Sequence, residues 1–167
     1  SSSSSKKRKK KQRMMQESDK RARALLQETG GFDPDNLNKT CLINGYSTTA
    51  INKACRIGTW GSVTPMLYFC VTGNLQMCRY LLSRDADCRK TDKYGCCPLY
   101  RAADGGYLEV IKLLCHHGGA REDIRKHNMS GYSPLRVALA HGHQDVSQWL
   151  ILNEALSSPR VGDGVID

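Results

Sequence analysis

One short pattern occurs three times in this sequence, and each copy opens with a small or hydroxyl residue followed by proline: Thr64-Pro65, Cys97-Pro98 and Ser133-Pro134. Eight residues after each proline stands a glycine, and a second apolar run follows that glycine. The prolines lie 33 and then 36 residues apart, so the second interval carries a three-residue insertion. A unit of this length cannot bury its apolar face alone, and its repetition therefore predicts a stack of helical units.

The residues within each unit predict two helices joined by a tight turn. The hydroxyls of Thr64 and Ser133 are expected to cap the first helices, and the prolines fit the first turn, where a missing N–H costs nothing. Gly73, Gly106 and Gly142 are expected to end these helices and allow the reversal. The second helices are expected over residues 75–82, 108–115 and 146–152.

The net charge of +9 belongs mostly to the amino-terminal end of the chain. Residues 1–28 hold ten Lys or Arg against three Asp or Glu, whereas the rest of the chain is nearly neutral. We expect residues 1–16 to be disordered because they have almost nothing to bury. Ser18 is expected to cap a short helix that Gly30-Gly31 stops.

The region before the first full unit predicts an irregular cap of two helices between residues 33 and 61. Leu37, Cys41 and Leu42 recur at helical spacing in the first helix, and Ile51, Ala54 and Cys55 do so in the second. No apolar run approaches the roughly 20 residues of a membrane span, and no signal-peptide pattern is present. The chain starts with Ser1 rather than Met, so we expect it to be a fragment of a longer protein.

The three units resemble the ankyrin repeat, whose pattern runs roughly Gly-x-Thr-Pro-Leu-His-x-Ala-Ala-x-x-Gly-His. The second unit, from Gly95 to Leu114, matches it best, and the third matches from Gly131 to His143. Two departures stand out: Cys97 replaces the family's Thr, and Asp85 stands where the family's Gly takes a left-handed conformation. The family's His is replaced as well, by Leu67, Tyr100 and Arg136.

The resemblance implies an all-α fold, an ankyrin-repeat helical solenoid of three full repeats behind an irregular N-terminal helical cap. The expected domains are a basic disordered tail with a short helix (1–30), the cap or partial repeat (33–61), the repeats (62–94, 95–130 and 131–156) and a disordered C-terminal tail (157–167). The insertion is expected to lengthen the tip at residues 121–130. We expect an intracellular monomer, in the nucleus or the cytoplasm.

The eight cysteines do not form a metal-binding pattern. Their spacing matches none of the paired C-x₂-C zinc arrangements, and the repeat register places most of them where a small apolar residue packs. No phosphate-binding loop or nucleophile elbow is present. We therefore expect no metal, no cofactor and no enzymatic activity.

The resemblance also implies a function, because ankyrin arrays bind proteins through their hairpin tips and the concave face of their first helices. We expect an unidentified protein partner. Tyrosine and arginine are the residue types that form interface hot spots. Carried over to this sequence, the candidate protein-binding residues are Tyr68, Arg89, Lys93, Tyr94, Tyr100, Arg101, Asp104, Arg125, His127, Arg136 and His141.

The basic run leaves three interpretations open. It consists of Lys6, Lys7, Arg8, Lys9, Lys10 and Lys11. Compact runs of this kind act as nuclear-import signals, dock on nucleic acid or anionic membranes, or only solvate a tail. The alternative function is therefore a nuclear or nucleic-acid-associated regulatory protein that uses this tail, which is the only part of the chain suited to nucleic acid.

Overall fold

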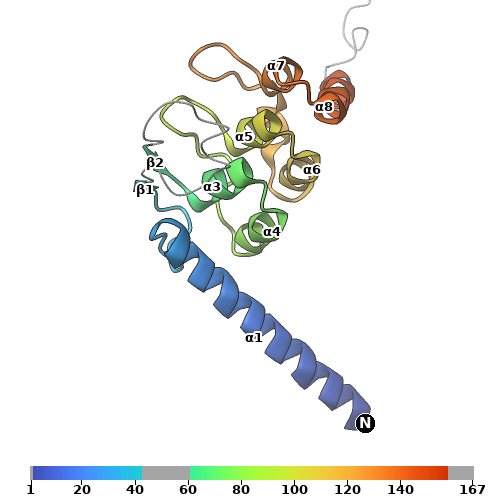
Figure 1. Cartoon of the computed structure of the whole chain (residues 1–167). Coiled ribbons are helices and arrows are strands. Elements are labelled where there is room, and N and C mark those ends of the chain that lie inside the picture. Colours follow the sequence, from blue (N-terminus) through green and yellow to red (C-terminus); the bar gives the residue numbers. More distant parts are fainter. Residues whose placement is uncertain (1, 43–60, 158–167) are drawn as a thin grey trace, which may run out of the picture.

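Three helix pairs stack side by side in the computed structural model, which describes residues 2–42 and 61–157 (Figure 1). The first helices α3, α5 and α7 pack on one another and form one layer, and α4 packs on α6 in the second layer. The predicted all-α repeat solenoid is confirmed. The bounds of the pairs are α3 (Pro65–Thr72) with α4 (Leu75–Ser83), α5 (Pro98–Gly105) with α6 (Leu108–His117), and α7 (Pro134–Ala140) with α8 (Gln144–Ser157).

The ends of the first helices follow the predicted chemistry. The Oγ1 of Thr64 accepts a hydrogen bond from the N–H of Leu67 at 3.3 Å, and the Oγ of Ser133 accepts one from the N–H of Arg136 at 3.2 Å. Gly73 and Gly106 end α3 and α5 with φ of +70° and +77°. A side chain at Gly73 would also meet the ring of Tyr107. The turn therefore requires glycine both for its positive φ and for the space that the ring occupies.

Asp85 adopts the left-handed conformation that the repeat register predicts, with φ of +59°. It is the only non-glycine residue with positive φ among the described residues. Aspartate tolerates this region better than most side chains.

The cap of α5 is weaker than its counterparts because a thiol replaces the hydroxyl. The Sγ of Cys97 accepts from the N–H of Tyr100 at 3.4 Å, and the side chain is buried. We expect Cys97→Thr to raise the free energy of unfolding by about 1 kcal/mol, since threonine is a strong N-cap of similar size. Urea unfolding measures this change, and the reciprocal Thr64→Cys should lower stability by a similar amount. A destabilised Cys97→Thr protein would show that the thiol is selected for packing instead.

The amino-terminal segment differs most from expectation. α1 (Ser2–Gly30) is one helix of 29 residues, about 43 Å long, where disorder was predicted for residues 1–16. Its Lys, Arg, Gln and Met residues have high helix propensity, and in the structure this propensity outweighs the repulsion among the Lys and Arg side chains. The helix ends as predicted at Gly30, and Gly31 follows with φ of +68°.

Residues 33–42 also correct the prediction, because they form turns and a short strand in place of a helix. The Oδ1 of Asp33 accepts from the N–H of Asp35 at 2.9 Å, which closes a turn around Pro34. Strand β1 (Cys41–Leu42) then pairs antiparallel with β2 (Ser62–Val63). The predicted cap helix through Ile51, Ala54 and Cys55 and the predicted tail after residue 157 lie outside the described residues.

The segment that carries the three-residue insertion folds back onto the array. It forms the 3₁₀ helix η1 (Ala120–Arg125), in which Ala120, Asp123 and Ile124 are buried. Asp123 receives both Nε (3.3 Å) and Nη2 (3.1 Å) of Arg89 from the preceding tip. Part of the segment expected to lengthen the tip thus packs beneath it.

One continuous apolar core runs between the two helix layers and reaches α1. Helix α1 adds Ala22 and Leu26 to it, and Phe32, two residues after the end of the helix, adds its ring. No helix within the described ranges is long and apolar enough to span a membrane. The largest fully buried side chains are Phe32, Leu26, Met66, Leu67, Leu81, Leu99, Ile111, Leu114, Ile124 and Leu150.

Candidate functional site

The tip between α4 and α5 is organised by one buried carboxylate. The Oδ1 of Asp92 accepts from the N–H groups of Tyr94 (2.9 Å) and Cys96 (3.0 Å), and its backbone carbonyl accepts from Gly95 N–H. Gly95 has a φ of +75°, which completes the turn. These bonds hold the Tyr94 side chain at the end of a rigid loop.

The other oxygen of Asp92 forms a buried ion pair. Its Oδ2 receives Nε of Arg101 at 2.9 Å and Nη2 at 2.7 Å. The two side chains are 0% and 8% exposed, so water does not screen the pair. The Nη1 of Arg101 lies 3.7 Å from Oδ2 of Asp104 on the same helix. The pair therefore fixes the tip to α5.

The tip between α6 and α7 is closed in the same way, but by a neutral amide in place of the Asp92 carboxylate. The Oδ1 of Asn128 accepts from the N–H groups of Ser130 and Tyr132, each at 3.0 Å. The two tips are joined, because the N–H of Met129 donates to the carbonyl of Tyr94 at 3.0 Å. Consecutive tips therefore form one continuous surface.

Five side chains on these joined tips and on the start of α7 define what we call the tip surface: Lys93, Tyr94, Met129, Tyr132 and Arg136. Tyr94 and Tyr132 are each 41% exposed, and Met129 is 78% exposed. The guanidinium of Arg136 lies 4.2 Å from the centre of the Tyr132 ring, and Lys93 Nζ lies 5.0 Å from that of Tyr94. The surface thus combines accessible apolar area with positive charge.

Four of the sequence-predicted residues are corrected by the structure, because they are buried: Tyr68, Tyr100, Arg101 and Asp104. Tyr68 packs edge-on against Phe32 and Phe69. Burial raises the pKa of Tyr100 to about 12. Their places on the first helices suggested side chains open to solvent, but Asp92 pairs with Arg101 and Phe32 packs against Tyr68.

Lys93, Tyr94 and Arg136 lie on the tip surface. The remaining predicted residues are also exposed, but they lie apart from that surface or make contacts within the array. Arg89 pairs with Glu122 and Asp123 of η1, and this raises the pKa of Arg89. Arg125 donates to the carbonyl of Glu154 at 2.7 Å. His127 lies exposed after η1.

His141 belongs to a contact between two units. Its Nδ1 lies 2.9 Å from Oδ1 of Asp104, and Nε2 of His143 lies 2.8 Å from the Asp104 carbonyl. Burial raises the pKa of Asp104, opposed by the nearby charges of His141 and Arg101. These contacts tie the end of α7 to α5.

The candidate residues chosen from the sequence do not include Met129 and Tyr132, although Met129 lies in a predicted tip. The 36-residue offset between units places Met129 where Lys93 stands, so the register alone could have found it. Tyr132 falls at the position of buried Cys96, and only the structure shows that its ring turns outward onto Arg136.

The cysteines in the described part of the chain are free thiols. Burial raises the pKa of Cys97 to about 11 and that of Cys115 to about 12, so both stay protonated near neutral pH. The Sγ atoms of Cys70 and Cys78 lie 3.8 Å apart in the core. Within residues 2–42 and 61–157, no group of three or more His, Cys, Asp or Glu residues is placed to hold a metal ion.

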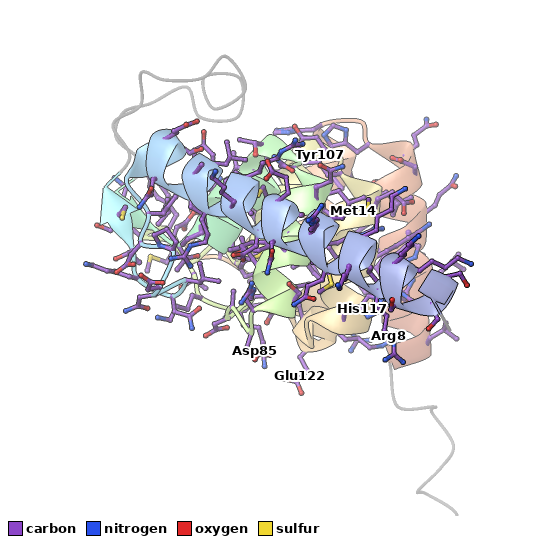
Figure 2. The ribbon with its side chains drawn as sticks, turned by 90° about the horizontal axis from the view of Figure 1, so that it is seen from below. Arg8, Met14, Asp85, Tyr107, His117 and Glu122 are labelled. Carbon is purple, nitrogen blue, oxygen red and sulfur yellow. The ribbon has the colours of Figure 1, made fainter. Side chains whose placement is uncertain are left out.

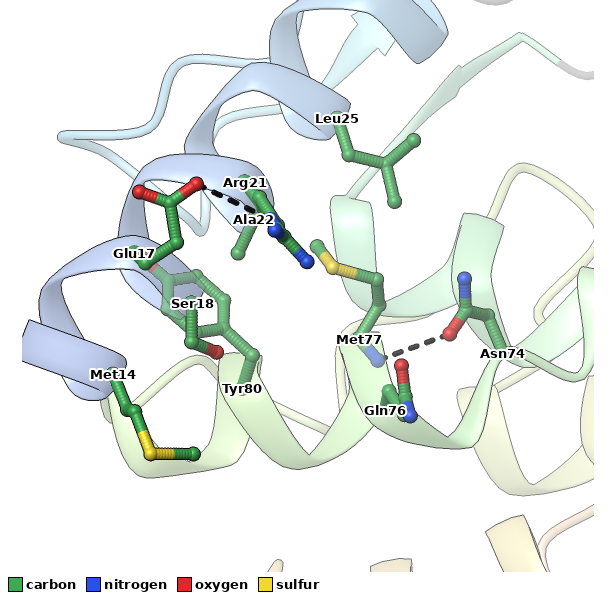
Figure 3. A pocket seen from close by; sticks show the side chains of 10 residues that line it. All are labelled: Met14, Glu17, Ser18, Arg21, Ala22, Leu25, Asn74, Gln76, Met77 and Tyr80. Carbon is green, nitrogen blue, oxygen red and sulfur yellow. Dashed lines mark hydrogen bonds and ion pairs between the residues drawn. The ribbon is translucent and has the colours of Figure 1, made fainter. Parts of the chain in front are cut away.

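An open groove of about 440 Å³ lies between α1 and α4 (Figure 3). Glu17 pairs with Arg21 across one turn of α1, and the Oδ1 of Asn74 caps the N–H of Met77. These polar groups on the lining are already engaged in the two contacts, and the lining holds no cluster of reactive side chains.

Comparison with known proteins gives one family. Residues 18–128 match the family model described as ankyrin repeats (3 copies). The chain is 41% identical over 64 residues to ankyrin repeat-containing protein ITN1 of Arabidopsis thaliana, covering 38% of this chain and 11% of that protein. It is 36% identical over 76 residues to the probable 26S proteasome regulatory subunit p28 of Saccharomyces cerevisiae (46% and 32%). It is 30% identical over 76 residues to human protein phosphatase 1 regulatory subunit 27 (46% and 47%). The matches span less than half the length of each relative.

Proposed function

This chain belongs to the ankyrin-repeat family, and we propose that it is a non-catalytic module that binds a protein partner through its tip surface. Ankyrin repeats generally mediate protein–protein interaction. Two of the relatives carry the names of regulatory subunits, one of the proteasome and one of a phosphatase. Regulation by association is the role that these names support for the present chain.

The observation that carries the proposal is the pairing of each exposed tyrosine with a cation. Tyr94 with Lys93 and Tyr132 with Arg136 present flat apolar rings beside positive charge, and Met129 adds adaptable apolar area. Tyrosine and arginine dominate interface hot spots, and the loop hydrogen bonds reduce the entropy lost on binding. A partner segment that carries acidic and apolar side chains fits this surface best.

The test removes the tip surface without touching the core. We expect the triple variant Tyr94→Ala, Tyr132→Ala, Arg136→Ala to bind about 30-fold more weakly or worse, since a single hot-spot residue contributes about 2 kcal/mol. Quantitative crosslinking with mass spectrometry identifies the partner, and calorimetry of the purified pair gives the affinity.

A matched control replaces three exposed side chains elsewhere, Lys39→Ala, Arg79→Ala and Gln148→Ala. Both variants should unfold close to the wild-type temperature, which separates lost contact from lost fold. Equal binding by the triple variant and the wild type would disprove the assignment of the tip surface.

A further inference from the structure

The amino-terminal half of α1 extends beyond the body of the protein (Figure 1). Each side chain from Ser3 to Ser18 is exposed, and docking begins at Asp19, whose Oδ1 accepts from the Tyr80 hydroxyl at 2.7 Å. Asp19 also pairs with Arg84. In Figure 2, Arg8 points outward from this half of the helix. The array thus holds a solvent-exposed helical arm.

The arm carries a very high density of one charge. Seven of the eight residues from 6 to 13 are Lys or Arg, and no Asp or Glu occurs before Glu17. Successive residues of a helix are turned by about 100°, so these cations point to all sides of the arm. A surface patch would place them on one side only.

This charge makes the free arm electrostatically unfavourable. Lys6 and Lys10, Lys7 and Lys11, and Lys9 and Arg13 are like-charged pairs at i,i+4, each costing roughly 0.2–0.5 kcal/mol. The first turn contains no acidic residue to oppose the positive end of the helix dipole. A polyanion around the arm would relieve both costs.

The dimensions of the arm fit double-stranded DNA. Residues 6–13 span about 11 Å, and a duplex carries one phosphate per roughly 1.7 Å, so about six phosphates face seven cations. A helix of about 10–12 Å diameter fits the major groove, which is about 12 Å wide and walled by phosphates on both sides. Cations on all sides of the helix can reach both walls.

Other polyanions fit less well. A flat membrane engages one side of a helix, and it also requires an apolar face that residues 2–13 lack. The major groove of duplex RNA is too deep and narrow for such a helix. We propose that residues 6–13 of α1 bind double-stranded DNA through its phosphates, without sequence preference, with the helix in the major groove.

The experiment titrates the full chain with a fluorescent DNA duplex of mixed sequence at several salt concentrations. We expect a dissociation constant of about 10⁻⁶–10⁻⁴ M at physiological salt and a log–log salt slope of roughly −5 to −6. Replacing Lys6, Lys7, Lys9 and Lys10 by Gln, which retains helix propensity, should flatten the slope by about 3 to 4. Binding should also increase the helical circular-dichroism signal that survives on heating.

The matched control replaces four exposed cations elsewhere by Gln: Lys39, Arg79, Arg121 and Lys126. It has the same net charge as the arm variant but should keep most of the slope. If both variants lost the same share of the salt slope, DNA binding would depend only on the net charge of the protein, and the proposal would be wrong. Tighter binding to anionic vesicles or to duplex RNA than to DNA would overturn the proposal too. The localisation of the arm variant in cells gives a further check. If the variant no longer accumulated in the nucleus but still bound DNA like the wild type, the basic run would be an import signal and the proposal would be wrong. The tip-surface variant should bind DNA like the wild type, which keeps this result independent of the proposed function.

Discussion

Replacing Arg101 by valine is expected to lower the free energy of unfolding by about 3–5 kcal/mol, because it leaves the buried carboxylate of Asp92 without its cation. The guanidinium contacts Oδ2 of Asp92 through two nitrogens, and neither side chain is open to solvent. Asp104, which also lies beside His141, would lose the positive charge of Arg101 at the same time. Urea unfolding followed by circular dichroism measures the loss.

The third unit supplies the matched rescue. At the 36-residue offset, Asn128 stands for Asp92 and Val137 stands for Arg101, and the Asn128 side chain still closes its loop. The double variant Asp92→Asn, Arg101→Val therefore rebuilds a neutral arrangement that the protein already uses. We expect it to unfold within about 1–2 kcal/mol of the wild type, since a neutral replacement of a buried ion pair is often tolerated.

Arg136→Val is the control, because Arg136 is exposed and its loss should change stability by less than about 0.5 kcal/mol. If Arg101→Val alone were as stable as this control, the Asp92–Arg101 pair would not hold the tip. Additive effects of the two single exchanges would likewise show that the pair is not coupled.

The parts of the fold that depend on local chemistry could be predicted from the sequence. Proline after a hydroxyl residue marks a helix start, and Gly73, Gly106 and Asp85 mark positions of positive φ. These rules involve neighbours in sequence and repeat in each unit. The repeat period then determines which faces stack.

The parts that depend on distant contacts could not be predicted. Arg101 was expected at the surface because its position on the first helix is usually open, and only the fold brings Asp92 over it. The apolar spacing of Leu37 and Cys41 suggested a helix, but the Asp33 turn and the pairing of β1 with β2 took precedence. The exposed face of Tyr132 likewise depends on Arg136 in the next helix.

Phe32 connects α1 to the array. It lies two residues after the end of the helix, is 1% exposed and packs edge-on against Tyr68 with ring centres 5.9 Å apart. Its N–H donates to the Leu26 carbonyl at 3.1 Å, which folds the chain back under the helix end. Within residues 3–29 of α1, only Ala22 and Leu26 are buried, so much of the docking area depends on the Phe32 ring.

We therefore expect Phe32→Ala to cost about 3–5 kcal/mol, the usual loss for a buried phenylalanine, and to release α1 before the repeats unfold. Limited trypsin digestion should cut at Lys20 and Arg23 much faster than in the wild type, while thermal unfolding of the repeats shifts less. Met14→Ala, at a side chain 64% exposed on the same helix, should change neither. Cleavage at the wild-type rate would show that the contacts of Asp19 with Tyr80 and Arg84 hold the helix without the ring. Because the basic arm lies beyond the docked part, the released helix should still bind DNA, so docking and DNA binding are separable properties of α1.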